Sequence, residues 1–322
     1  MKKLINITNY KDDLARYTDA SDLQNMITRF GLDGLEVMPS SAQAPLYPFL
    51  PGQVIGVHMR CQSDWLDLWN HDVDALNLEY GSPAIWESVF CGSTRNVLLQ
   101  RGKEDLEYAR LHRAQYVVFH ISNVRTTDIL TNSFSYSDKE VILAAAQLIN
   151  QLLADYTDTP FYFLMENLWW PGLRMTEPAL TKMLLDHISY PKKGIMLDIG
   201  HFLHTNPGLR TQREAIACLK QMLHAHAELT DFIKGIHLHQ TLSGAYMEAY
   251  LSSPPEIPLD YYERFTKAMY HVLAIDRHEP FTDPAICEII HQISPDYLTL
   301  ELISGSRAEH EHKIRTQLEA LH

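Results

Sequence analysis

The sequence predicts a single-domain α/β protein, a (β/α)8 TIM barrel that spans residues 1–322. Short apolar runs rich in β-branched or aromatic residues alternate with longer amphipathic segments, and eight such runs are found. Strands that alternate with helices form a parallel sheet, and eight is the number of strands that closes a barrel. The rival is a doubly wound open sheet. It normally carries a glycine-rich phosphate turn after its first strand, and residues 9–19 contain no glycine.

Each apolar run has the length and composition of a buried strand. The expected strands, in order, are 3–10 (KLINITNY), 34–38 (GLEVM), 54–59 (VIGVHM), 116–122 (YVVFHIS), 161–167 (FYFLMEN), 194–200 (GIMLDIG), 233–240 (IKGIHLHQ) and 297–303 (YLTLELI). Amphipathic segments at 137–156, 211–233 and 307–322 predict helices. Ser137, with Glu140 three residues later, has the pattern of a capping box at a helix start.

Two connections, at about 61–115 and 241–296, are long for a barrel of this kind. We expect each to contain helices and to make an excursion over the mouth of the barrel. Residues 242–262 (LSGAYMEAYLSSPPEIPLDYY) are rich in Tyr and Pro, which favours a lid or a substrate-binding loop.

Composition limits the class of partner. The formal net charge of −13 repels phosphate backbones, which argues against a nucleic-acid substrate and favours a small molecule. The four cysteines are widely spaced with no CxxC motif, as in proteins of a reducing compartment. The sequence has no apolar run long enough for a signal peptide or a membrane span, so we expect a cytoplasmic protein without a membrane partner.

Ionisable residues recur where the expected strands end. They are His58, His120, Glu166, Asp198 with His201, His237 with His239, and Glu301. The carboxyl ends of parallel barrel strands converge on one face, and polar groups in apolar strands are costly to bury unless they are paired or bind a metal. Any one of them alone is more typical of a hydrogen-bonded core residue. Together, imidazoles and carboxylates are the ligands that zinc, manganese or iron prefers, so we predict a metal site.

Ten other histidines fall on segments expected to be helices or loops. We interpret them as solvated or capping residues: His112, His187, His204, His224, His226, His271, His291, His310, His312 and His322.

Five motifs in order, GLDGLEV, MEN, LDIGH, GIHLH and LELI, cover nearly the whole chain. The series resembles the xylose-isomerase-like TIM barrel superfamily, which holds sugar isomerases, ketose 3-epimerases, inosose dehydratases and endonuclease IV-type phosphodiesterases (AP endonuclease family 2). In the isomerase branch the resemblance implies four ligands, with the two glutamates also acting as acid and base. Here these would be Glu166, Asp198, His237 and Glu301.

The endonuclease IV branch binds three metal ions through additional histidines and an Asp-x-His pair, which Asp276-Arg277-His278 supplies here. Nine residues together resemble that trinuclear set: His58, His120, Glu166, Asp198, His201, His237, Asp276, His278 and Glu301. The chain departs from the branch at Gln240, near which many relatives place an acidic residue, and in the long spacing from His237 to Asp276. On a regular strand His239 faces the same side as His237, as an alternative ligand or as a partner of one.

Three functions follow from these patterns. The first is a metal-dependent hydrolase of a phosphodiester or a phosphorylated small molecule, because two or three ions suit phosphoester hydrolysis. The alternative is a single-metal sugar isomerase, epimerase or inosose dehydratase, in which one carboxylate removes a proton and the other returns it. The third is a barrel that uses its mouth for binding alone. We expect one to three ions per chain, with zinc first because imidazole dominates and manganese or iron open. The resemblance also implies a homo-oligomer.

Four further residues, together with His239, are candidates for binding the substrate. Arg60 and Arg277 could hold an anionic group, or could neutralise a neighbouring carboxylate. Trp169 and Trp170, directly after Glu166-Asn167, could stack on a ring of the substrate or hold a loop against the barrel.

Overall fold

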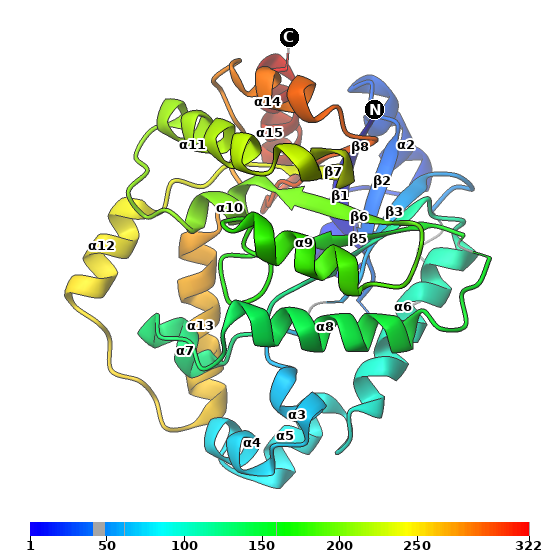
Figure 1. The fold of residues 1–322 in the computed structure, drawn as a ribbon. Helices are drawn as coiled ribbons and strands as arrows, with labels where there is room; N and C mark the ends of the chain where they lie inside the picture. The colour runs from blue at the N-terminus through cyan, green and yellow to red at the C-terminus, as the bar shows by residue number, and fades with distance from the viewer. Residues whose placement is uncertain (41–48, 61, 159, 322) are drawn as a thin grey trace.

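Eight parallel strands close a barrel in the computed structural model of the chain, with each strand hydrogen-bonded to the next in sequence and β8 to β1 (Figure 1). The structure describes residues 1–40, 49–60, 62–158 and 160–321. The strands are β1 (Lys2–Thr8), β2 (Gly34–Met38), β3 (Val54–His58), β4 (Tyr116–His120), β5 (Tyr162–Glu166), β6 (Lys193–Asp198), β7 (Ile233–Leu238) and β8 (Tyr297–Leu300). The predicted TIM barrel and all eight strand positions are confirmed.

The core has two main parts because the side chains of a barrel strand point alternately inward and outward. A small cluster that includes Leu4, Tyr116 and Met196 forms one part, and a larger cluster packs the strands against the helices. Tyr116 depends on a glycine in the neighbouring strand, because a Cβ on Gly56 would lie 2.1 Å from the Tyr116 ring. The buried Tyr116 hydroxyl thereby reaches Glu36 of β2, at 2.5 Å.

Helices surround the barrel, and the two predicted excursions consist largely of helix. Their bounds are α1 (Lys11–Leu14), α2 (Ala20–Arg29), α3 (Leu66–Asn70), α4 (Val73–Tyr80), α5 (Pro83–Phe90), α6 (Asn96–Leu111), α7 (Thr126–Thr131), α8 (Asp138–Leu152), α9 (Pro178–His187), α10 (Ile199–His204), α11 (Gln212–Ala225), the 3-10 helix η1 (Ala227–Phe232), α12 (Gly244–Ser252), α13 (Tyr261–Ile275), α14 (Ile286–Ile293) and α15 (Arg307–Glu319). The first excursion carries α3 to α6 and the second α12 to α14. No helix in the described ranges is long and apolar enough to cross a membrane.

Local sequence accounts for where several helices begin and end. Ser137 and Glu140 form the predicted capping box at the start of α8. The single helix predicted over 211–233 is wrong at its carboxyl end, because α11 ends at Ala225 and η1 follows. The break falls at His226, whose ring nitrogen Nδ1 lies 3.0 Å from the Met222 carbonyl oxygen and so competes for the carbonyls of the last helical turn.

A buried arginine joins the two excursions. Arg264 of α13 donates from Nε to the Thr126 hydroxyl oxygen of α7 at 2.8 Å, and its guanidinium also contacts the carbonyl and carboxylate of Glu79 in α4. Glu79 in turn accepts a hydrogen bond from the Thr126 backbone N–H at 3.0 Å. These contacts hold α4, α7 and α13 together, and in Figure 1 α7, α12 and α13 lie on the side toward which the β6 arrow points.

Candidate metal centre

The predicted ligands lie where barrel strands end. His58, His120, Glu166 and Asp198 are the last residues of β3, β4, β5 and β6. His237 is the penultimate residue of β7, and Glu301 directly follows β8. Sheet register brings neighbours to the same level, because His120 pairs with Glu166 across β4 and β5 and Asp198 pairs with His237 across β6 and β7. The strand ends therefore deliver these side chains to one mouth of the barrel.

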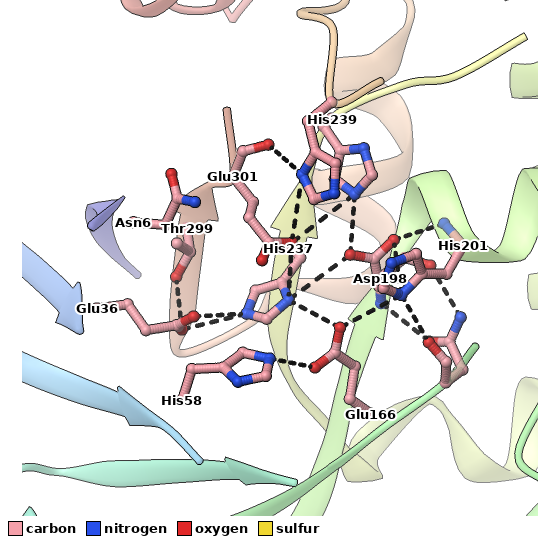
Figure 2. Close-up of polar contacts among 12 residues, drawn as sticks. Asn6, Glu36, His58, Glu166, Asp198, His201, His237, His239, Thr299 and Glu301 are labelled. Atoms are coloured by element: carbon pink, nitrogen blue, oxygen red, sulfur yellow. Dashed lines mark hydrogen bonds and ion pairs between the residues drawn. The ribbon is translucent and has the colours of Figure 1, made fainter. Parts of the chain in front are cut away.

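Glu166 is fully buried and faces imidazoles on both of its oxygens. Its Oε2 lies 3.0 Å from His58 Nε2 and 3.2 Å from His120 Nε2, whereas its Oε1 lies 3.2 Å from His237 Nδ1. Burial alone would raise the pKa of Glu166, but the three histidines outweigh it and hold the pKa well below its usual value. Glu166 is thus a carboxylate at physiological pH and contacts two sets of imidazoles at once (Figure 2).

The Asp-x-x-His spacing of LDIGH is a helix-capping geometry. Asp198 ends β6 and is the N-cap of α10, and its Oδ1 accepts the backbone N–H of His201 at 2.6 Å. Its other oxygen, Oδ2, lies 2.9 Å from His239 Nε2 and 3.6 Å from His237 Nδ1. Asn167 fixes the Asp198 backbone through two hydrogen bonds of 2.9 Å. The cap leaves one oxygen of Asp198 free to serve the centre.

Asp276 and His278 reach the same mouth from the second excursion. Asp276 is the C-cap of α13, and its Oδ2 lies 2.8 Å from His278 Nε2 and 3.2 Å from His201 Nε2. The turn places His278 at φ 47°, a left-handed conformation that costs energy in most non-glycine residues and gathers at functional sites. Burial opposes protonation of His278, but Asp276 raises its pKa to about 9.

The side chains that could hold metal ions gather in overlapping groups. Within each group the nitrogen and oxygen atoms lie within 4.8 Å of one another. We name three of them: the first group is His58, His120 and Glu166; the central group is Glu166, Asp198, His237 and Glu301; the third group is His201, His239, Asp276 and His278. A further combination, His58 with His237 and Glu301, overlaps the first and central groups. All nine predicted ligand residues belong to these groups.

Hydrogen bonds at the outer ring nitrogens test whether the histidines suit metal ions. Nδ1 of His58, His201 and His278 lies 2.9, 3.0 and 2.9 Å from the carbonyl oxygens of Met59, Asn167 and Glu301. A ring nitrogen facing a carbonyl carries the proton, so in the neutral ring Nε2 presents its lone pair to the carboxylates of the centre. Two facing lone pairs repel each other unless a proton or a metal ion lies between them. The residues therefore fit divalent ions.

Glu36 of β2 is a buried carboxylate that the ligand prediction missed. His237 Nε2 lies 2.9 Å from Glu36 Oε1, and Glu36 Oε2 accepts a hydrogen bond from the Thr299 hydroxyl at 3.1 Å (Figure 2). Glu36 Oε2 also accepts from the Tyr116 hydroxyl, at 2.5 Å. Burial raises the pKa of Glu36, but His237 outweighs burial and lowers it. Since Nε2 of His237 donates to Glu36, Nδ1 is left to face the central group. The sequence feature that could have predicted the role of Glu36 is the presence of an acidic residue inside the apolar run GLEVM.

His239 belongs to the third group, and His204 lies next to it. The ring of His239 stacks on that of His278, with centroids 3.9 Å apart, and its buried Nδ1 has no hydrogen-bond partner within the described part of the chain. His204 was predicted to be solvated or capping, which is wrong. Its side chain is buried, with Nε2 3.4 Å from Asp276 Oδ1 and Nδ1 2.9 Å from the Ser243 hydroxyl.

The same correction applies to two other histidines. His271 and His310 are buried because they lie on the inward faces of their helices. A hydroxyl partner makes burial tolerable for each: Tyr246 at 2.8 Å and Tyr17 at 2.9 Å, respectively. His226 is also buried, but it is the C-cap of α11 and so has one of the two predicted roles. His322 lies outside the described residues.

The predicted substrate-binding residues take different positions. Arg60 is paired with carboxylates of α6, Asp105 at 2.7 Å and Glu104 at 2.9 Å. The Arg277 side chain is 65% exposed and lies 3.9 Å from Glu279. The Trp169 ring contacts two histidines of α10, with centroids 5.1 Å from His201 and 4.8 Å from His204, and Trp170 packs beside Trp169 at 4.4 Å. The tryptophans are therefore beside the centre, and Arg60 neutralises neighbouring carboxylates.

No model of a known protein family matches the sequence, and no curated protein matches it. Solved structures match over nearly the whole chain. A 3-keto-D-glucoside 4-epimerase from E. coli is 13% identical with a TM-score of 0.52, covering 99% of this chain and 98% of that one. Endonuclease IV from Thermus thermophilus is 13% identical with a TM-score of 0.53, covering 100% of this chain and 99% of that one.

An IolI protein with a bound zinc atom is likewise 13% identical, with a TM-score of 0.53 and coverage of 99% of this chain and 96% of that one. At this level of identity the likeness is one of fold. It shows that the chain shares the TIM-barrel fold of these structures, which include both an epimerase and an endonuclease.

Proposed function

We propose that the chain is a metal-dependent hydrolase that cleaves a phosphodiester or a phosphorylated small molecule at a centre of two or three divalent ions. One observation carries the proposal: the two oxygens of Glu166 face different groups. Oε2 faces His58 and His120 of the first group, and Oε1 faces His237 of the central group. A carboxylate in that position suits a bridge between two ions, which a single-ion enzyme does not need.

Bound ions would supply a hydroxide near neutral pH and stabilise the departing oxygen of the ester. The protein residues hold the groups in a fixed relation to one another. Asp198 links the central and third groups, because it caps the helix that carries His201 while its Oδ2 faces His237 and His239. Asp276 orients the third group by facing His201 and His278 with one oxygen.

The net charge of −13 is the reason to propose a small substrate rather than a nucleic acid. An acidic surface gives up the electrostatic attraction on which most nucleic-acid affinity depends. Zinc is the proposed ion, because imidazoles form the majority of the first and third groups.

A single-ion sugar isomerase or epimerase is the second candidate. It is favoured by the central group, which contains three carboxylates and one imidazole and needs no other residue to hold one ion. An epimerase is also among the structural matches. In that reaction Glu166 and Glu301 would exchange protons with the sugar carbons, and the first and third groups would have no evident purpose.

Metal content per chain separates the two candidates. We would purify the protein without chelator or added metal and measure metals by plasma mass spectrometry. The same measurement would follow for His58→Ala in the first group, His278→Ala in the third, and Glu166→Ala. His291→Ala is the matched control, because His291 is exposed on α14.

The hydrolase predicts two or three equivalents of metal, a lower content in both histidine variants, and hydrolysis of bis(p-nitrophenyl) phosphate. The isomerase predicts one equivalent that disappears with Glu166→Ala and is insensitive to His58→Ala and His278→Ala. The second pattern would exclude the multinuclear centre.

A further inference from the structure

A cavity of about 190 Å³ lies beside the third group, between α7, the loop after β5, α10 and the lid helices α12 and α13. We name it the side cavity. Its walls combine apolar and aromatic residues, among them Ile129, Phe134, Trp169, Trp170, Met247 and Leu251, with polar residues such as Asn132, Thr205 and Ser243. Ile129, Phe134 and the two tryptophans belong to a hydrophobic cluster that is separate from the barrel core. The cavity is thus lined by loops and helices outside the barrel core.

The side cavity borders the third group directly. His204 and Trp169 both line it, and Trp169 also contacts His201, with ring centroids 5.1 Å apart. Nε2 of His204 lies 3.4 Å from Asp276 Oδ1. One imidazole ring therefore separates the cavity from a carboxylate of the third group. The side cavity is therefore adjacent to the third group.

The charged groups on the cavity walls are already neutralised. Arg174 is paired with Asp138, at 2.6 Å. Burial lowers the pKa of His271 to about 4, so its ring is neutral near pH 7, and Tyr246 satisfies its Nδ1 at 2.8 Å. Such walls disfavour an ionic substituent and suit an apolar one.

Size limits the occupant further. A dry apolar cavity of about 150 Å³ holds one benzene molecule. The side cavity is somewhat larger, at about 190 Å³. It is therefore large enough for one ring. Flat aromatic walls add favourable contacts for a ring that stacks or meets them edge to face.

We infer that the side cavity binds a single-ring, apolar substituent of the phosphoester, next to the phosphoryl group at the metal centre. The inference rests on the proposed function, because the centre must hold the phosphoryl group. It narrows the substrate class to esters that carry one ring-sized apolar group.

Two non-hydrolysable phosphonates test it by isothermal titration calorimetry on the full-length, zinc-loaded protein. Phenylphosphonate and methylphosphonate share the anionic head and differ in the group offered to the cavity. We expect phenylphosphonate to bind at least about tenfold more tightly, because burial of a ring removes far more apolar surface from water than burial of a methyl group.

Variants test whether the difference in affinity between the two phosphonates arises in the side cavity. Met247→Asp and Leu251→Asp place a charge on the cavity wall and should reduce the preference for phenylphosphonate to less than about threefold, leaving methylphosphonate unchanged. Leu251 is 45% exposed, so its substitution should not unfold the protein. Leu259→Asp is the matched control, because Leu259 is 98% exposed and lies outside the cavity lining; it should keep the full preference.

The outcomes distinguish this inference from the function on which it rests. Equal affinity for the two phosphonates, or a preference that survives both wall variants, would overturn the side cavity as the binding site and leave the hydrolase standing. Failure of both phosphonates to bind the zinc-loaded protein would overturn the proposed function, and this inference with it.

Discussion

Glu36 determines which nitrogen of His237 faces the metal centre, although its own carboxylate belongs to none of the three groups. Glu36→Gln removes the charge that holds the proton on Nε2. We expect the zinc affinity of the central group to fall about 10-fold to 100-fold, which is typical when the partner of a metal-binding histidine is lost. Competition with a chelating dye measures it. Glu107→Gln on α6, whose side chain is 47% exposed and pairs with Arg110, is the control. An unchanged affinity for Glu36→Gln would contradict the role.

Gly200 of the LDIGH run is required by the imidazole of His239. A Cβ at position 200 would lie 2.0 Å from His239 Cε1, and that ring cannot retreat because it stacks on His278. We predict that Gly200→Ala lowers the free energy of unfolding by roughly 1–3 kcal/mol, the usual cost of overpacking a core. Urea denaturation measures it.

A double variant separates this clash from a general effect on α10. Gly200→Ala combined with His239→Ala should be more stable than the sum of the two single effects, because the clash is gone. Gly305→Ala is the control, since a Cβ there would meet its nearest atom at 3.7 Å. Strict additivity would show that His239 is not the reason for the glycine.

At the scale of elements, α15 is joined to the start of the chain through a neutral histidine. His310 is 1% exposed, and its Nδ1 lies 2.9 Å from the Tyr17 hydroxyl. Burial, assisted by the nearby Arg16, lowers the pKa of His310 to about 3 from 6.5. The unfolded chain therefore binds this proton below pH 6.5, whereas the folded protein binds it only near pH 3. The contribution of neutral His310 to the free energy of unfolding is therefore complete above pH 6.5 and is lost progressively as the pH falls toward 3.

Between pH 7.5 and pH 5 the loss from His310 should be about 2 kcal/mol. Other groups also titrate in this interval, so the comparison is with His310→Gln, which keeps a hydrogen-bond acceptor for Tyr17 and cannot be protonated. The variant should lose about 2 kcal/mol less than the natural protein over the same interval in urea unfolding. Equal losses would mean that His310 is protonated in the folded protein.

Sequence patterns predicted elements well where the signal is local, and failed where it depends on contacts distant in sequence. The capping box at Ser137 was predictable because both partners lie within one turn. The burial of His271 and His310 was not, because their partners Tyr246 and Tyr17 lie 25 and 293 residues away. The side cavity also escaped prediction, because α7, α10, α12 and α13 meet there only in the folded chain.

At the scale of the whole molecule, strand periodicity was sufficient to predict the barrel, and barrel geometry was then sufficient to bring together the six predicted ligand residues at the ends of β3 to β8. The carboxyl ends of parallel strands in a closed barrel lie on one face of the barrel, independent of the conformation of the loops. The prediction selected ionisable residues at strand ends. Glu36 was missed because it lies two residues before the end of β2. Its role depends on the inward pleat and on the distant His237.

Because the ligands come from the ends of β3 to β8, bound ions would link six neighbouring strands of the closed barrel. When the metal is removed, the buried carboxylates of Glu166 and Asp198 both face the imidazole of His237 with no metal ion between them. We therefore expect the ions to stabilise the entire barrel, by about 3 kcal/mol for one site at a free zinc concentration about 100-fold above Kd.

Differential scanning calorimetry before and after dialysis against EDTA measures this as a fall in Tm of the main transition. Zinc added back should restore the Tm, whereas magnesium at the same concentration should not, because magnesium prefers oxygen ligands and the first and third groups are mainly imidazole. Restoration by magnesium alone would place the ion among the carboxylates of the central group and favour the single-ion isomerase. If the Tm does not change when metal is removed or when either metal is added, imidazolium–carboxylate pairs alone hold the six strand ends together.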